Sequence, residues 1–109
     1  MKRNLANGEL TITSHAIKKI VYFAVTESYG PVNIETDSFL GRIFGREEEK
    51  IRVEEREDSS VLVELFLDLE YGIKISEVAR NIIDNVKHKL MELADISDVV
   101  VNVHITSLK

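Results

Sequence analysis

The fold is decided by the stretch VLVELFLDL at residues 61–69, where every odd-numbered residue is valine or leucine. Side chains alternate between the two faces of a strand, so this period of two predicts a strand with one fully apolar face. The preceding segment, about 50–57, alternates in the same way, and Asp58, Ser59 and Ser60 between the two are typical turn residues. We therefore predict an antiparallel hairpin, closed at its far end by Tyr71 and Gly72.

Two segments have the apolar spacing of amphipathic helices. The first runs from about 15 to 27, with Ser14 as its predicted N-cap, and Gly30 and Pro31 end it. The second runs from about Ser76 to Ala94, and its predicted core face holds Val78, Ala79, Ile82, Ile83, Val86, Leu90 and Leu93.

Two further strands complete the predicted order of elements. Leu10 and Ile12 alternate with polar neighbours before the first helix, and alternation returns at 99–105 after the second. The order is strand, helix, irregular segment, strand, strand, helix, strand. It predicts an α+β fold: a two-layer sandwich in which a mixed or antiparallel sheet carries both helices on one face. A chain of 109 residues fits a single domain, 1–109.

Composition excludes several classes of protein. The chain has no cysteine, which rules out disulfides, thiolate metal sites and a cysteine nucleophile. Its net charge is −5, which argues against nucleic-acid binding because such proteins usually carry a basic surface. Residues 1–8 hold no apolar run, so we expect no signal peptide, and no stretch reaches the roughly 20 apolar residues that span a bilayer.

The remaining polar residues give no catalytic or metal-binding pattern. His15, His88 and His104 lack zinc-motif spacing, and we expect no metal and no cofactor. Glu64, Asp68 and Glu70 share one strand face, where a solvated or interface role is the simpler interpretation than acid–base chemistry. The sequence has no G-x-S-x-G elbow and no phosphate loop, so we expect no catalytic residue and no enzymatic activity.

The segment from Val32 to Lys50 contains a first candidate interface. Its apolar residues fit one face of a short helix, with arginines beside them: Phe39, Leu40, Arg42, Ile43, Phe44 and Arg46. This element is either a partner-docking surface or a plug at one end of the sheet. The acidic run 47–49 would be repelled by anionic lipid, which favours a protein partner over direct membrane contact.

A second candidate interface is the water-facing side of the sheet. Leu62, Phe66 and Val100 are apolar where alternation predicts exposure. Either a second subunit covers them, or the irregular segment does. Both interpretations remain open from the sequence.

Three motifs together resemble a known family. They are GELTIT at 8–13 leading into a helix, the run Glu70–Tyr71–Gly72 followed by Val78–Ala79–Arg80, and VNVH at 101–104, which holds Asn102 and His104. In this order they are similar to the alkaline shock protein family, also called the Gls-type envelope stress family, over nearly the whole chain. The family often has proline at the position of Ser76, and either residue can begin a helix.

The resemblance implies a non-catalytic role. Family members are cytoplasmic proteins of bacterial cell-envelope homeostasis and stress; some are held at the membrane by an anchoring partner, and some self-associate. We therefore expect a cytoplasmic protein-binding domain that self-associates and reaches the inner face of the membrane through a partner, with no nucleic acid bound. Two alternatives stay open: a nucleic-acid-binding or regulatory module shaped like a KH domain, and an accessory protein to a lipid-metabolism or envelope enzyme.

Overall fold

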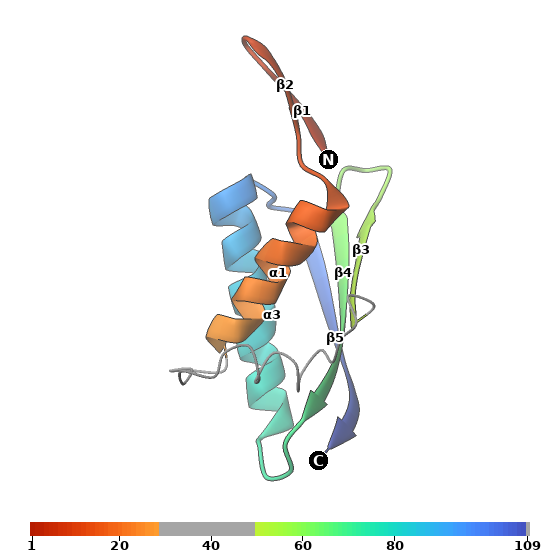
Figure 1. The fold of residues 1–109 in the computed structure, drawn as a ribbon, viewed down its shortest axis with the longest axis vertical. Helices are drawn as coiled ribbons and strands as arrows, with labels where there is room; N and C mark the ends of the chain where they lie inside the picture. Colours follow the sequence, from red (N-terminus) through yellow and green to blue (C-terminus); the bar gives the residue numbers. More distant parts are fainter. Residues whose placement is uncertain (29–49, 109) are drawn as a thin grey trace.

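The computed structural model describes residues 1–28 and 50–108 (Figure 1). Its elements in chain order are β1 (Lys2–Leu5), β2 (Gly8–Thr11), α1 (Ser14–Ser28), β3 (Ile51–Glu55), β4 (Val61–Leu69), α3 (Ile75–Ala94) and β5 (Val99–Leu108). The residues at 29–49, with the candidate interface Phe39–Arg46, lie outside this description.

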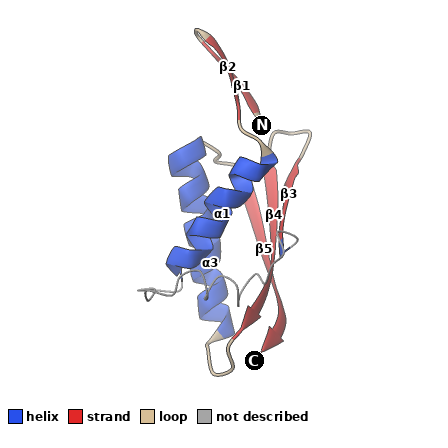
Figure 2. Cartoon of the chain, in the orientation of Figure 1, coloured by secondary structure: helices blue, strands red, loops and turns tan. Residues whose placement is uncertain are grey.

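The main sheet has three strands in the order β3-β4-β5. β3 and β4 form the predicted antiparallel hairpin, with Ile51 opposite Leu65 and Glu55 opposite Val61. β4 and β5 are parallel, and α3 makes the crossover that a parallel pair requires. Both helices lie on the same side of this sheet (Figure 2). The predicted α+β class with two helices on one face is confirmed.

The core lies between the sheet and the helices. The odd-numbered residues of β4 are at most 2% exposed, as the alternation at 61–69 predicts. They pack with buried residues from the other elements: Ile17, Val21, Ala24 and Val25 of α1, Ile82, Val86, Leu90 and Ala94 of α3, and Val99 and Val101 of β5. Leu93 was predicted for the core face of α3, yet it is 62% exposed, since it lies beyond the edge of the buried stripe.

The N-terminal strand is where the architecture differs from the simplest expectation. β2 forms, but it pairs with β1 in a separate two-stranded hairpin that projects away from the main sheet (Figure 1). Every residue of β2 is exposed, so this strand contributes no apolar face to the core. The two-residue turn is Ala6–Asn7, and Asn7 with the following Gly8 is the turn-favouring feature of the sequence. β1 itself has a single apolar residue, Leu5, and no alternation to reveal it.

The helix starts also differ slightly from prediction. The Oγ1 of Thr13 accepts a hydrogen bond from the N–H of Ala16 at 3.1 Å, so Thr13 and not Ser14 caps α1. α3 begins at Ile75 after Lys74, which makes no side-chain cap. Ser76 therefore lies inside the first turn. Between β4 and α3 the chain turns through Gly72, whose φ of 99° is strained for any residue with a side chain.

Candidate protein interface on the open sheet face

The candidate site is the face of the main sheet that points away from the helices, here called the open face. It is built from the even-numbered residues of β4 and their cross-strand neighbours. One row joins Glu54, Leu62 and Val100, the next joins Arg52, Glu64 and Asn102, and Phe66 lies beside His104. Period-two geometry places all of them on one surface.

Phe66 is the centre of this surface. Its ring stacks on the His104 ring, with centroids 4.8 Å apart and planes 14° from parallel. The Arg52 guanidinium carbon lies 5.5 Å from the same ring's centroid, within cation–π range. Arg52 also lies 3.9 Å from a Glu64 carboxylate oxygen. Phe66 therefore contacts both neighbouring strands, which holds a large aromatic ring in place on an exposed surface.

The open face remains partly apolar and accessible among the described residues. Val100 is 39% exposed, whereas Leu62 and Phe66 are half-buried. Leu62 and Val100 are direct cross-strand partners, so they form one small apolar patch beside the Phe66 ring. The structure brings together the three residues of the second candidate interface, and their role as an interface stays a prediction.

A polar contact stabilises the irregular part of β5. Thr106 is an extra residue where the register with β4 shifts, and its hydroxyl proton can be donated either to the Asp68 carboxylate, at 2.7 Å, or to the Leu67 carbonyl, at 3.2 Å. The bulge is thus stabilised locally.

Elsewhere, His88 pairs with Glu92 along α3 at 2.9 Å. In residues 1–28 and 50–108 no three acidic or histidine side chains form a metal-binding group.

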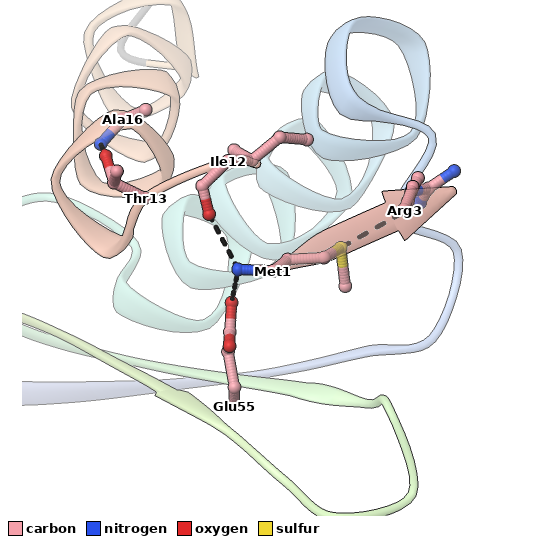
Figure 3. Close-up of polar contacts among 6 residues, drawn as sticks. All are labelled: Met1, Arg3, Ile12, Thr13, Ala16 and Glu55. Carbon is pink, nitrogen blue, oxygen red and sulfur yellow. Dashed lines mark hydrogen bonds and ion pairs between the residues drawn. The ribbon is translucent and has the colours of Figure 1, made fainter. Parts of the chain in front are cut away.

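A second surface feature lies where the N-terminal hairpin meets the body of the domain. The amino group of Met1 donates to the Ile12 carbonyl at 2.7 Å and pairs with the Glu55 carboxylate (Figure 3). Arg3 reaches from β1 to the Asp95 carbonyl at the end of α3, where a cation is favoured by the helix dipole. A groove of about 480 Å³ borders these contacts.

This groove has a mixed polar lining. Its charged lining residues come from β1, from the end of β3 with the turn after it, and from the connection between α3 and β5: Lys2, Arg3, Glu55, Arg56, Asp58, Asp95 and Asp98. The hydroxyl of Ser60 donates to Asp58 at 2.6 Å, and this bond, followed by the Ser60 N–H bond, lowers the pKa of the Asp58 carboxyl. The opposite charges neutralise one another locally, so the groove favours neither an anion nor a cation.

The residues of the resembling motifs have structural placements of their own. Tyr71 and Gly72 form the turn after β4, where the Tyr71 side chain is 84% exposed. Val78 and Ala79 are half-buried in the first turns of α3, and Arg80 is exposed. Asn102 and His104 lie on the open face. These motif residues thus lie in three places: the turn after β4, the start of α3 and the candidate interface.

With this geometry in place, comparison with known proteins decides the family. The sequence profile of the alkaline shock protein 23 family, described as having a cell envelope-related function, matches residues 2–109. The chain belongs to this family. It is the family that the three motifs resemble, so that resemblance is confirmed.

Two curated relatives come from Streptococcus pyogenes serotype M6. The chain is 27% identical over 105 residues to the uncharacterized protein Spy1535, covering 93% of this chain and 79% of that protein. It is also 27% identical over 114 residues to the uncharacterized protein Spy1614, covering all of this chain and 94% of that protein. No solved structure matches the chain.

Sequence reasoning missed two features of these surfaces. It took Leu62, Phe66 and Val100 as an apolar set without the Arg52 and His104 contacts that surround Phe66. Strand register was the missing information, because cross-strand neighbours are set by pairing and not by sequence distance. The Arg3 contact with Asp95 joins residues 92 positions apart and left no local signal.

Proposed function

We propose that this alkaline shock protein domain is a non-catalytic scaffold that binds other proteins, including further copies of itself, through the open face of its sheet. The observation that supports this most directly is the ordered Phe66 ring, held by Arg52 and His104 beside the Leu62–Val100 patch. Interface centres are typically rich in aromatic and arginine side chains of this kind.

The cellular setting of the proposal follows the family. A cell envelope-related function is described for the alkaline shock protein family, and no helix among the described residues is long and apolar enough to cross a membrane. We propose that the domain acts on the cytoplasmic side and reaches the membrane through an anchored protein partner. The alternatives, a KH-like module and an accessory protein to an envelope enzyme, remain predictions.

The first test is self-association measured by sedimentation velocity over a range of concentrations. Phe66→Ser should weaken it about tenfold or more, since truncating a central aromatic residue commonly costs over 1 kcal/mol of binding energy. Phe23→Ser is the matched control: it removes a phenylalanine that is 61% exposed, but on the helix layer. Association that both variants leave unchanged would contradict a contact through the open face.

The second test addresses the anchoring partner. Wild type, Phe66→Ser and Phe23→Ser would serve as baits in a nuclease-treated lysate, with captured proteins identified by mass spectrometry. The proposal expects a membrane-anchored protein that is retained by wild type and Phe23→Ser and lost from Phe66→Ser. Recovery of ribosomal proteins that vanish with nuclease would support the KH-like alternative instead.

A further inference from the structure

The two edges of the main sheet differ in how they are protected against pairing. β3 is five residues long and carries Arg52, Glu54 and Glu55. β5 is ten residues long, and its sequence, VVVNVHITSL, contains no lysine, arginine, carboxylate or proline. Short length and charge are the usual devices that keep an exposed edge from pairing with another strand. β3 has both and β5 has neither.

The hydrogen-bonding direction along β5 follows from its pairing with β4. The carbonyl of Asp98 accepts from the Val61 N–H at 2.9 Å, just before the parallel register begins at Val99. In a parallel ladder every second residue of a strand points both backbone groups toward its neighbour. The intervening residues point theirs outward, and up to the bulge at Thr106 they are Val99, Val101, Val103 and Ile105.

The outer edge of β5 has no strand partner in the part of the chain that the structure describes. There β5 is the last strand of the sheet and pairs with β4 alone. Val99 and Val101 on this edge are buried, so its accessible part lies at Val103 and Ile105. The side chains beside the free edge are apolar or uncharged polar groups, and Val103 and Ile105 are half-buried against the core with one side still accessible. An exposed backbone row without charge repulsion is a template for a further strand.

We infer that β5 is the strand through which two copies of this chain pair, edge to edge and antiparallel, to form one continuous six-stranded sheet. This inference rests on the proposed self-association, but it assigns the contact between copies to a strand edge and leaves the open face to other partners. An uncharged strand can face its own copy in any register without placing like charges opposite each other. β3 avoids like-charge contacts only in a register that sets Arg52 opposite Glu54, and a shift by two residues would set Glu54 opposite its own copy.

The number of bonds is sufficient for a specific contact. Four outward residues on each copy, each donating and accepting once, give about eight hydrogen bonds, within the range of about ten found in typical protein interfaces. A two-fold axis makes the contact self-complementary and closes it at two copies. The two open faces then lie side by side on one sheet, which doubles the surface offered to a third protein.

Backbone amide exchange on the wild-type protein tests the inference directly. The N–H groups of Val101 and Val103 should exchange quickly at low concentration and become protected by at least tenfold as the concentration rises. The N–H groups of Val100 and Asn102, which point toward β4, serve as internal controls and should be protected throughout. If sedimentation shows association but the amide exchange rates of Val101 and Val103 do not change with concentration, edge pairing is overturned. The open-face contact would then remain the explanation of the association.

Two substitutions provide an independent test. Val103→Pro removes one outward N–H without removing a bond to β4 and should weaken association about tenfold or more. Because proline could disturb folding, circular dichroism must show that this variant is folded. Asn102→Lys adds a charge where β5 borders the open face and should weaken association through either surface, so Val103→Pro is the variant that distinguishes the two. Asn81→Lys is the matched control, because it adds the same charge at an exposed asparagine of α3 on the helix layer. It should have no such effect.

The outcomes distinguish self-association through the open face from pairing through β5. Edge protection that survives Phe66→Ser supports pairing through β5 and overturns self-association through the open face. Association weakened by Phe66→Ser but not by a folded Val103→Pro variant overturns edge pairing. A wild-type protein that stays monomeric at all concentrations overturns both.

Discussion

At the scale of single residues, Asp95 shows how backbone conformation constrains the end of α3. It adopts a left-handed φ of 55°. Its N–H donates to the Met91 carbonyl and the Ile96 N–H donates to the Leu90 carbonyl, which closes the end of the helix. The left-handed conformation costs a residue such as alanine roughly 1 kcal/mol, because its side chain cannot form the local hydrogen bonds that Asp and Asn form there.

We predict that Asp95→Ala unfolds more easily than Asp95→Gly. Glycine has no Cβ to clash, whereas alanine retains the strain, so the difference in unfolding free energy should be about 1 kcal/mol. Urea denaturation of the two variants measures it. Asp95→Asn, which tolerates the same conformation, should resemble wild type; equal stability of the alanine and glycine variants would contradict the argument.

A second residue-scale prediction concerns pH. The bonds from Ser60 lower the pKa of Asp58 in the folded protein below its ordinary value of 3.8. A depressed carboxyl pKa stabilises the fold above the unfolded-state value, and this contribution is lost as the pH falls through the folded-state value. Ser60→Ala should therefore be less stable than wild type at pH 7, and the gap should narrow below about pH 4.

Denaturation curves of both proteins at pH 7 and pH 3 provide the measurement. Ser97→Ala is a suitable control because it alters an exposed loop serine without removing either bond to Asp58. A stability gap between wild type and Ser60→Ala that is the same at both pH values would show that the Asp58 carboxylate is not involved.

At the scale of the element, β4 separates stability from binding on its two faces. Leu67 is fully buried and Phe66, its neighbour, is half-buried on the open face. We predict that Leu67→Ala lowers the unfolding free energy by about 2–5 kcal/mol through loss of packing and a residual cavity. Phe66→Ser should cost clearly less, because its ring contacts Arg52 and His104 on the surface.

Thermal unfolding followed by circular dichroism compares the two variants. The result also determines how the association experiments are interpreted, since Phe66→Ser must remain folded to report on binding. A Phe66→Ser protein as unstable as Leu67→Ala would place the Phe66 ring in the core.

The N-terminal hairpin is an element held by few contacts. A two-stranded hairpin is marginally stable alone, and this one is joined to the body through Met1, Ile12 and Arg3. We predict that Arg3→Ala increases amide exchange in β1 and β2 while lowering global stability by less than about 1 kcal/mol, because the ion pair is partly exposed. Lys2→Ala is the control, and an Arg3→Ala exchange pattern that matches wild type would show that Arg3 does not anchor the hairpin.

At the scale of the whole molecule, the periodicity of apolar residues predicted the elements that pack against the core. It did not predict which strands pair with each other. The alternation at 61–69 and the stripe on α3 are imposed by the core, so they are visible in the sequence and β4 and α3 were found nearly to the residue. β1 is exposed and leaves no apolar pattern. Its pairing with β2 lies outside the core, so no apolar pattern marks it. The exposure of Leu93 likewise depends on how far the sheet and α1 extend along α3, which the sequence of α3 alone does not show.

The candidate site also has a part that the sequence predicted and a part that it did not. Leu62, Phe66 and Val100 were predicted to share a face, because alternation assigns faces. The unprotected edge of β5 was not predicted, because a strand's position in the sheet order does not follow from its own sequence. The predicted role of Phe39 to Arg46 lies outside the described residues.

The parallel pairing of β4 with β5 also sets the order in which the molecule can assemble. Val61 pairs with Val99, and the whole of α3 lies between them in the chain. Pairings so distant in sequence are generally slow to form. The β3–β4 hairpin, whose partners are close in sequence, can form first. Until β5 arrives, the long central strand is an open edge, so slow-folding intermediates of this chain are exposed to aggregation at β4, the strand that the finished fold shields best.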